Sequence, residues 1–384
     1  MNSGIHIMLT AGGTGGHIFP AIAVAEELIT RRYTISLITD KRGADLGLNL
    51  KNMPVHRVNA SNMRGGLLTK INGVISISAG IIQAQRLFRQ FRSKFVIGFG
   101  GYPTMPTIFA AAILRLPYII HEQNAVIGRA NRLVAKRASR IATSFTQTIG
   151  LDPKLEGRII NTGNPVRCAF TDIRGQGYPK LQNENERLRI LILGGSQGAK
   201  IFSEVIPRAF ITMPEKLRQR FYVTQQCRSE DIKSVQDQYR QAGVLVELKT
   251  FFNNVPQLMG AAHIVITRSG ASTVAELAEA GRPAILVPYP NATDDHQTVN
   301  ARSVEAAGAG WLIPNDDFTP ETVKNHLERL IKTPEIAETA ADAARLLGGD
   351  NAAAQVVDEI EKVLKFPQFA TSQYSATENQ DGTR

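Results

Sequence analysis

The 384-residue chain has little cysteine, few aromatic residues and no long apolar run. The two cysteines, Cys168 and Cys227, are far apart and form no C-x-x-C pair. That spacing predicts neither a disulfide framework nor a zinc site, so a reducing compartment is expected. No run of about 18 apolar residues and no signal-peptide pattern is present, so we expect a protein that is neither secreted nor membrane-spanning.

Acidic residues are scarce in the first half of the chain. Residues 1–166 hold 20 Lys and Arg against 7 Asp and Glu, whereas the remainder holds 24 against 27. The one-sided charge predicts an anionic partner for the first half, either nucleic acid or an anionic membrane surface, although a solvated basic face stays an alternative. An aromatic content of 7% and the lack of an RNP-like run argue against RNA.

Length and patterning predict two α/β domains. Apolar strand-length runs alternate with helical stretches, which indicates parallel sheets with helices on both faces. The expected strands are 5–10, 34–39, 55–59, 95–99, 118–121 and 141–144, then 188–193, 221–224, 244–248, 264–267, 284–288 and 311–313. Polar, glycine-containing sequence over 162–187 predicts the connection between domains. We expect domains at 1–166 and 167–348, a returning helix at about 349–365, and a disordered tail at 366–384.

The segment AGGTGGHIFP, Ala11 to Pro20, joins an apolar strand to a helix. Its glycines allow a ligand to approach the backbone, and the N-terminus of the new helix attracts anions. Ile18 stands where the dinucleotide fingerprint needs its third glycine, and the Gly-Lys-Ser/Thr of a Walker A loop is missing. A phosphate-handling turn is therefore predicted, although such a turn also serves packing alone.

Further polar turns follow other predicted strands. GFGGYPTMP (98–106) and HEQNAVIGRAN (121–131) lie in the first half, and GGSQGAK (194–200) opens the second series. Ligands of parallel sheets bind beyond the carboxyl ends of the strands, so paired glycine turns predict a bound nucleotide diphosphate. No D-x-D sequence occurs, so we expect no divalent metal or other cofactor, and helix dipoles would stabilise a leaving diphosphate.

Seven motifs in order resemble the MurG family of bacterial peptidoglycan glycosyltransferases: GGTGGH, GFGGY, HEQN, GNPVR, GGSQGA, RSGASTVAELAEAG and DDHQTVNA. The resemblance covers roughly residues 5–364. It implies the GT-B architecture, two Rossmann-like domains facing a cleft, and an inverting transfer of GlcNAc from UDP-GlcNAc to the 4-hydroxyl of MurNAc in lipid I. The product is lipid II, used in cell-wall synthesis, cell shape and division. A UDP-GlcNAc 2-epimerase and a non-catalytic nucleotide-sugar-binding protein remain alternatives.

By that resemblance the donor lies mainly against the second domain. Glu276 would accept hydrogen bonds from the ribose hydroxyls, and Ser196 would meet a phosphate. The other implied donor contacts are Arg167 and the Phe252 backbone at the uracil, Asn124, Gln297 and the Ala271 backbone at sugar hydroxyls, and His296 and Thr14 near the diphosphate. For His296 a plain role in a polar loop stays open.

The acceptor is expected to meet first-domain turns. Tyr102, His121, Glu122 and Gln123 lie there, with Gly15 and Gly16 beside Thr14 as substrate-binding residues. His17 is the first candidate for the catalytic base, because the positive end of its helix dipole disfavours imidazolium. Glu122 is the second candidate. A binding role for His17, or a structural role for His121, remains possible.

An amphipathic stretch, 71–94, mixes apolar residues with Arg86, Arg89, Arg92 and Lys94. It predicts a peripheral contact with the anionic cytoplasmic face of the inner membrane. A core-facing helix with a solvated basic face is the alternative.

Overall fold

The computed structural model describes residues 4–40, 53–60, 67–181, 183, 186–195, 198–349 and 351–365. Of residues 67–71 it describes the backbone alone. The chain divides into two compact units. One comprises Met1–Pro165 with Asn351–Arg384, and the other comprises Val166–Asp350. The expected disordered tail at 366–384 lies outside the described residues.

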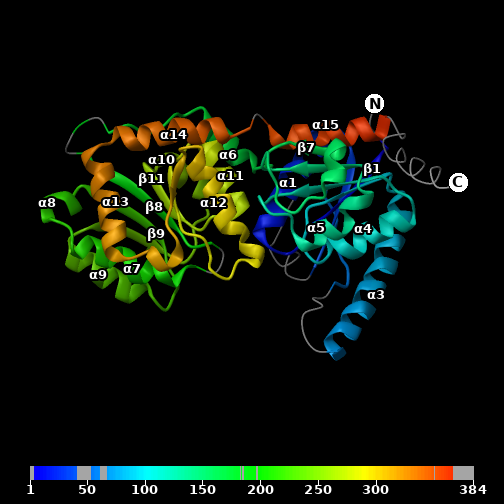
Figure 1. The fold of residues 1–384 in the computed structure, drawn as a ribbon, viewed down its shortest axis with the longest axis horizontal. Helices are drawn as coiled ribbons and strands as arrows, with labels where there is room; N and C mark the ends of the chain where they lie inside the picture. The colour runs from blue at the N-terminus through cyan, green and yellow to red at the C-terminus, as the bar shows by residue number, and fades with distance from the viewer. Residues whose placement is uncertain are drawn as a thin grey trace, which may run out of the picture. The chain divides into compact units, whose positions relative to one another are not determined.

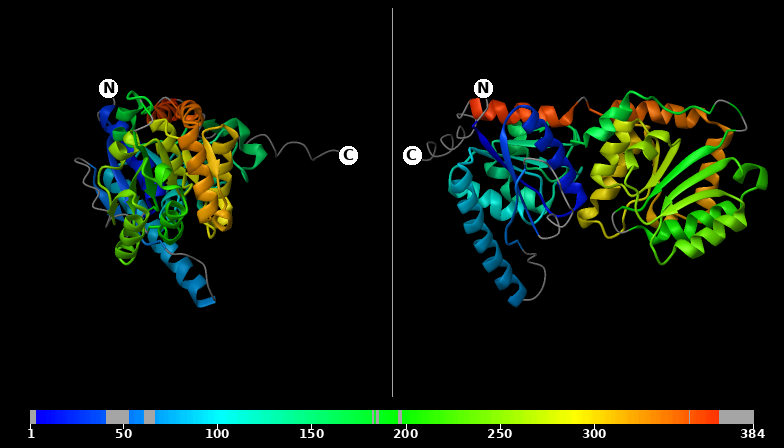
Figure 2. Two further views of the ribbon diagram at one scale, coloured as in Figure 1. Left: turned by 90° about the vertical axis from the view of Figure 1, so that its left-hand side faces the viewer. Right: turned by 180° about the vertical axis from the view of Figure 1, so that it is seen from behind.

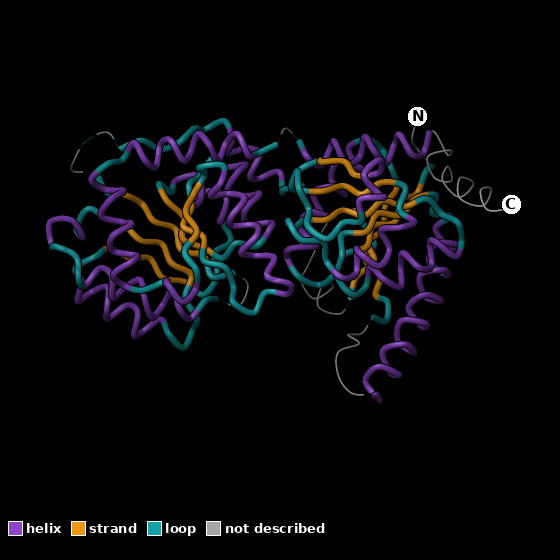
Figure 3. Tube along the Cα trace, viewed as in Figure 1, coloured by secondary structure: helices purple, strands orange, loops and turns teal. Residues whose placement is uncertain are grey.

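The first unit contains a parallel sheet (Figures 1 and 3). Within the described residues this sheet has seven strands, in the order β3-β2-β1-β4-β5-β6-β7. Its strands are β1 (His6–Thr10), β2 (Thr34–Thr39), β3 (Val55–Arg57), β4 (Phe95–Gly98), β5 (Tyr118–Glu122), β6 (Arg140–Thr143) and β7 (Ile159–Asn161). Since all these strands run the same way, their carboxyl ends lie at one edge of the sheet.

Helices cover both faces of this sheet: α1 (Gly15–Thr30), α3 (Leu67–Phe91), α4 (Thr104–Ile113), α5 (Arg129–Val134), the 3-10 turns η1 (Ala135–Arg137) and η2 (Pro153–Arg158), and α15 (Ala352–Lys365). Alternate residues of β1 point to opposite faces. Ile7 and Leu9 share a core with α1 and α15, and Met8 joins the core beneath α3 and α4. Both faces of β1 are therefore buried, as its unbroken apolar sequence requires.

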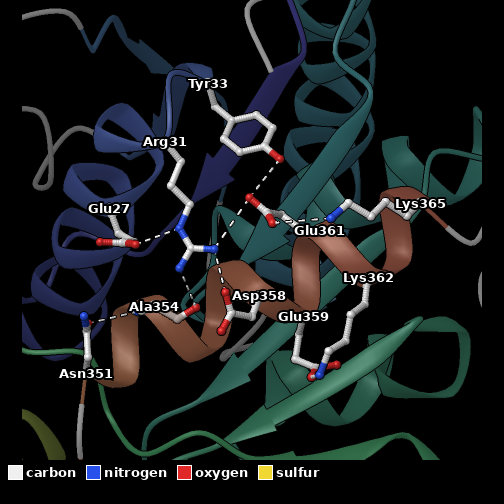
Figure 4. Close-up of polar contacts among 10 residues, drawn as sticks. All are labelled: Glu27, Arg31, Tyr33, Asn351, Ala354, Asp358, Glu359, Glu361, Lys362 and Lys365. Atoms are coloured by element: carbon white, nitrogen blue, oxygen red, sulfur yellow. Dashed lines mark hydrogen bonds and ion pairs between the residues drawn. The ribbon is translucent and has the colours of Figure 1, made fainter. Parts of the chain in front are cut away.

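The last described helix, α15, packs on α1. Val356, Val357 and Ile360 enter the core of the first unit. Arg31 at the end of α1 adds polar contacts, because its guanidinium donates to Glu27, Asp358 and the Ala354 carbonyl (Figure 4). The end of the described chain is thus anchored on the unit in which the chain begins.

The second unit also contains a parallel sheet (Figure 2). Within the described residues this sheet has six strands, in the order β10-β9-β8-β11-β12-β13. Its strands are β8 (Leu188–Leu193), β9 (Phe221–Gln226), β10 (Leu245–Lys249), β11 (Ile264–Thr267), β12 (Ala284–Leu286) and β13 (Gly310–Leu312). The helices are α6 (Cys168–Arg174), α7 (Lys200–Ile211), α8 (Glu215–Arg218), α9 (Ile232–Ala242), α10 (Val255–Ala261), α11 (Ala271–Ala280), α12 (His296–Ala306), α13 (Pro320–Lys332) and α14 (Glu335–Leu347), with 3-10 turns η3 (Thr293–Asp295) and η4 (Asn315–Asp317).

The predicted α/β class with two Rossmann-like parallel sheets is confirmed. Two local expectations were wrong. Strand β7 was not predicted, because its three residues are too few to show the apolar pattern that marks a strand in the sequence. The connection between the units is shorter than 162–187, since α6 belongs to the second unit and buries Phe170 and Ile173. Among the described helices, none is long and apolar enough to cross a membrane.

Candidate functional site

Two glycine turns of the first unit meet at the carboxyl edge of its sheet. The Gly12 amide, after β1, donates to the Gly100 carbonyl, after β4, at 2.9 Å. A Cβ on Gly12 would lie 2.8 Å from the Gly101 Cα, and one on Gly101 would lie 2.5 Å from the Gly12 Cα. Gly100 and Gly101 also have positive φ angles of 87° and 83°. Only glycine fits this contact.

His17, in the first turn of α1, lies against these glycines. A Cβ on Gly100 would stand 3.2 Å from its Cε1 and Nδ1, and one on Gly101 would stand 3.4 Å from its Cδ2. The half-buried imidazole also makes a 3.0 Å hydrogen bond between Nδ1 and Oε1 of Gln123. The His17 side chain is therefore positioned by the glycine turn after β4 and by Gln123, which directly follows β5.

The HEQN segment (121–124) spans the end of β5, and its first three residues, His121, Glu122 and Gln123, are buried. His121 has no exposed surface, and burial lowers its pKa to about 4 despite a hydrogen bond to the Gly163 carbonyl at 3.0 Å. The Glu122 carboxylate accepts from the amides of Asn124 and Gly128 and from the Asn131 side chain, at 3.0, 2.8 and 2.8 Å. Both oxygens of Glu122 are thus engaged in holding its own loop.

The N-terminus of α1 forms the other wall of this region. Thr14 is its N-cap residue, with extended backbone angles and no side-chain capping bond, and the first turn contains no acidic residue. The Thr14 side chain and Gly16 are exposed, and Gly15 is half-buried. A helix start of this kind attracts an anion. Tyr102, 38% exposed, and half-buried Asn124 follow β4 and β5 at the same edge.

In the second unit the predicted carboxylate is paired. Glu276 of α11 is 8% exposed, and its Oε1 accepts from Nη2 of Arg167 at 2.8 Å. Burial raises the pKa of Glu276, and the adjacent Arg167 guanidinium opposes that rise. Oε2 takes no hydrogen bond from the part of the chain described here, which leaves it as an acceptor for a ligand.

Other predicted residues of this unit follow β11 and β12. Ala271 begins α11, and the Gln297 Oε1 accepts from the Tyr289 amide at 2.9 Å. His296 begins α12, with Nδ1 donating to the Thr293 carbonyl at 2.6 Å. The Phe252 side chain is 4% exposed, so only its backbone can meet a ligand. Ser196 lies outside the described residues.

Several polar residues around these turns were not singled out from the sequence. The Ser269 hydroxyl donates to the Gln297 carbonyl at 2.8 Å, and Asn300 donates to the Ser269 carbonyl at 3.1 Å. Asn131 bonds both Glu122 and the His121 carbonyl. In the sequence, these residues could have been found as candidates by their position inside the RSGAS, TVNA and GRAN segments.

Comparison with known families matches both units. The glycosyltransferase family 28 N-terminal domain matches residues 7–143, and the family 28 C-terminal domain matches residues 189–360. The chain is 47% identical over 354 residues to the Rhodospirillum centenum protein named UDP-N-acetylglucosamine--N-acetylmuramyl-(pentapeptide) pyrophosphoryl-undecaprenol N-acetylglucosamine transferase, covering 92% of this chain and 93% of that one. A Zymomonas mobilis protein of the same name is 40% identical over 385 residues, covering 100% and 99% of the two chains.

Solved structures agree. Acinetobacter baumannii MurG matches with a TM-score of 0.76 and 30% identity, covering 93% of this chain and 99% of that chain. The UDP-GlcNAc 2-epimerase of Neisseria meningitidis, solved with UDP-GlcNAc, matches with a TM-score of 0.64, covering 93% and 100% of the two chains. At 17% identity the epimerase shares the fold alone.

The contact between the glycine turns gives a stability prediction. Gly101→Ala should lower the free energy of unfolding by about 1 to 3 kcal/mol, because its Cβ collides with Gly12 backbone and its φ is +83°. Denaturant unfolding measures the loss. Gly16→Ala is the matched control, since its Cβ would meet nothing within 4 Å. Equal unfolding midpoints for both variants would contradict the prediction.

Proposed function

The chain belongs to glycosyltransferase family 28, and on that premise we propose that it transfers N-acetylglucosamine from UDP-GlcNAc to the 4-hydroxyl of MurNAc in lipid I. The product is lipid II, and the process is peptidoglycan synthesis. One observation carries the proposal. Relatives that bear the name of this transferase are 40 to 47% identical to the chain over nearly the full length of both proteins.

The donor is proposed to bind the second unit. A carboxylate accepts two hydrogen bonds, which suits the vicinal hydroxyls of a ribose. Glu276 supplies such a group, with Arg167 on one oxygen. Ala271 and Gln297 would face the sugar, and the helix start at His296 would lie near the diphosphate. Ser196, Phe252 and Asn124 keep the donor roles that the motifs imply.

The acceptor is proposed to bind the first unit beside Gly15 and Gly16, and Thr14 keeps its implied place near the diphosphate of the donor. In the reaction the muramyl 4-hydroxyl oxygen attacks the anomeric carbon in line, the bond to UDP breaks, and UDP leaves with the electron pair. A base takes the hydroxyl proton. Helix N-termini, rather than a metal ion, stabilise the departing diphosphate.

His17 fits the role of base better than Glu122. Both oxygens of Glu122 accept hydrogen bonds within its own loop, and the side chain is 1% exposed. His17 is half-buried, and its Nε2 has no hydrogen-bond partner among the described residues. We therefore assign proton removal to His17 and support of the loop to Glu122.

A membrane-facing surface is proposed on α3, whose N-terminal half extends away from the sheet of its unit (Figures 1 and 2). Phe88 is buried and Ile81, Leu87 and Phe91 pack partly into the core, but Val74, Ile75 and Ile82 are more than half exposed. Arg86 and Arg89 of α3, and Arg92 and Lys94 just after it, are exposed as well. This α3 surface suits peripheral binding to the anionic cytoplasmic leaflet of the inner membrane, where the lipid acceptor resides.

The reaction is tested by incubating the protein with UDP-GlcNAc and a short-chain lipid I analogue. We expect UDP release together with a disaccharide product, and neither without the acceptor. Conversion of UDP-GlcNAc without lipid I would favour the epimerase alternative, and binding of UDP-GlcNAc without turnover would favour a sensor.

Glu276→Ala should weaken UDP and UDP-GlcNAc binding together, because a lost diol contact costs on the order of 1 to 3 kcal/mol. Calorimetric titration measures both affinities. Glu279→Ala is the matched control, since it removes a second buried carboxylate of α11, which pairs with Arg174 at 3.1 Å. An unchanged UDP affinity in the Glu276 variant would remove that residue from the donor site.

Reversing Arg86, Arg89 and Arg92 to Glu should reduce binding to anionic vesicles and leave UDP affinity intact. Each basic residue near an anionic leaflet contributes about 1 kcal/mol. Vesicle sedimentation at moderate salt measures the effect. The control reverses exposed Arg208, Arg240 and Arg302 of the second unit, which changes the net charge equally. Similar vesicle binding by the two triple variants would argue against the α3 surface.

His17→Ala should lower kcat by about 10² to 10⁴ with donor affinity little changed, because the general base is lost. Steady-state kinetics at saturating lipid I analogue measure kcat, and titration with UDP measures donor affinity. Should kcat stay near the parental value while only the acceptor KM rises, His17 would be a binding residue rather than the base.

A further inference from the structure

Three side chains form a continuous hydrogen-bonded relay that ends at His17. The imidazole of His121 bonds the Gly163 carbonyl through Nε2 at 3.0 Å. The Gln123 amide nitrogen lies 3.0 Å from Nδ1 of His121 and 3.0 Å from the His121 carbonyl. The Gln123 amide oxygen lies 3.0 Å from Nδ1 of His17. His121 and Gln123 are 0% and 1% exposed, so both side chains are buried.

The donor and the acceptor of each hydrogen bond follow from the bond between His121 and the Gly163 carbonyl. A backbone carbonyl only accepts, so Nε2 of His121 carries the proton, and in a neutral ring Nδ1 is then an acceptor. Burial keeps His121 neutral, since its pKa lies at about 4. The Gln123 NH₂ group must therefore face His121, where it donates both protons, to Nδ1 and to the carbonyl. The amide oxygen is left for His17.

We propose that Gln123, oriented by His121, is a positioning residue that holds His17 as the Nδ1–H tautomer and so presents the Nε2 lone pair as the base. An amide oxygen accepts and does not donate, so Nδ1 of His17 must carry its proton toward Gln123. Which ring nitrogen is free for chemistry is decided by the bond that the other nitrogen makes. This inference rests on the proposed role of His17 as base.

The orientation of the His17 ring is fixed as well as its tautomer. Gly100 and Gly101 pack against the imidazole of His17, and the bond to Gln123 sets its rotation. The relay also runs from Gly163 to α1, so it joins segments after β7, at the end of β5 and after β1 of the same unit. A ligand at the start of α1 would thus meet an imidazole whose rotation and proton position are already set.

The direct test is nuclear magnetic resonance of the full chain labelled with ¹⁵N-histidine, at neutral pH and without substrate. We expect a protonated Nδ1 and an unprotonated Nε2 for His17, and the reverse for His121. Comparison with the spectrum of His17→Asn identifies the His17 signals. A protonated Nε2 on His17 would overturn the inference without bearing on whether the protein is a transferase.

Variants link the tautomer to turnover. Gln123→Met keeps the side-chain length but removes the amide, so His17 should lose its fixed Nδ1–H signature. Its kcat should fall about 10-fold or more, while the KM for UDP-GlcNAc stays near the parental value. The matched control, Thr107→Val, deletes a buried hydroxyl that donates to the Pro103 carbonyl at 2.8 Å, outside the relay. It should keep the His17 tautomer and a near-parental kcat.

Two outcomes of the variant experiment contradict the positioning role. One is a Gln123→Met protein with parental kcat, and the other is an equal loss of kcat in both variants. If His17→Ala keeps activity while the parent shows the Nδ1–H tautomer, the proposed base fails and the tautomer assignment stands. The spectrum of the parent protein decides the inference even if Gln123→Met does not fold.

Discussion

The close approach of Gly12 to Gly101 is the constraint on which the proposed catalytic region of the first unit depends. Strands β1 and β4 are neighbours, so their turns are forced together, and neither turn has room for a side chain at the contact. The space beside the glycines is filled by the ring of His17 instead. A side chain at either glycine would move α1, the imidazole and the bond to Gln123 together.

The two units share one electrostatic feature, a helix N-terminus at the carboxyl edge of a parallel sheet. In each, turns at the carboxyl edge of a parallel sheet lead into a helix whose first turn lacks acidic residues, as in α1 and α11. Helix N-termini carry partial positive charge, and glycine lets an anion approach them. Diphosphate chemistry can therefore be supported by backbone dipoles. The ion pair with Arg167 offsets the free-energy cost of burying the Glu276 carboxylate, since an unpaired buried carboxylate is strongly unfavourable.

The sequence was sufficient for what depends on local patterns. Apolar strand-length runs such as 188–193 predicted strands, and glycine turns such as 11–16 predicted the places where strands give way to helices. It was insufficient where contacts are non-local. Strand β7 is stabilised by pairing with β6, not by its own pattern. The role of Glu122 in its loop, and the bond from Gln123 to His17 across 106 positions, depend on a register that only the folded sheet supplies.

The choice of an amide rather than a carboxylate beside His17 has an electrostatic reason. Between Asp45 and Asp152 the chain contains one acidic residue, Glu122, and its oxygens are engaged within its own loop. A carboxylate at position 123 would add negative charge beside a helix start proposed to hold a diphosphate, and like charges repel. It would also favour imidazolium over the neutral ring that a base requires. A neutral amide fixes the tautomer without either cost, which is consistent with the basic character of this unit.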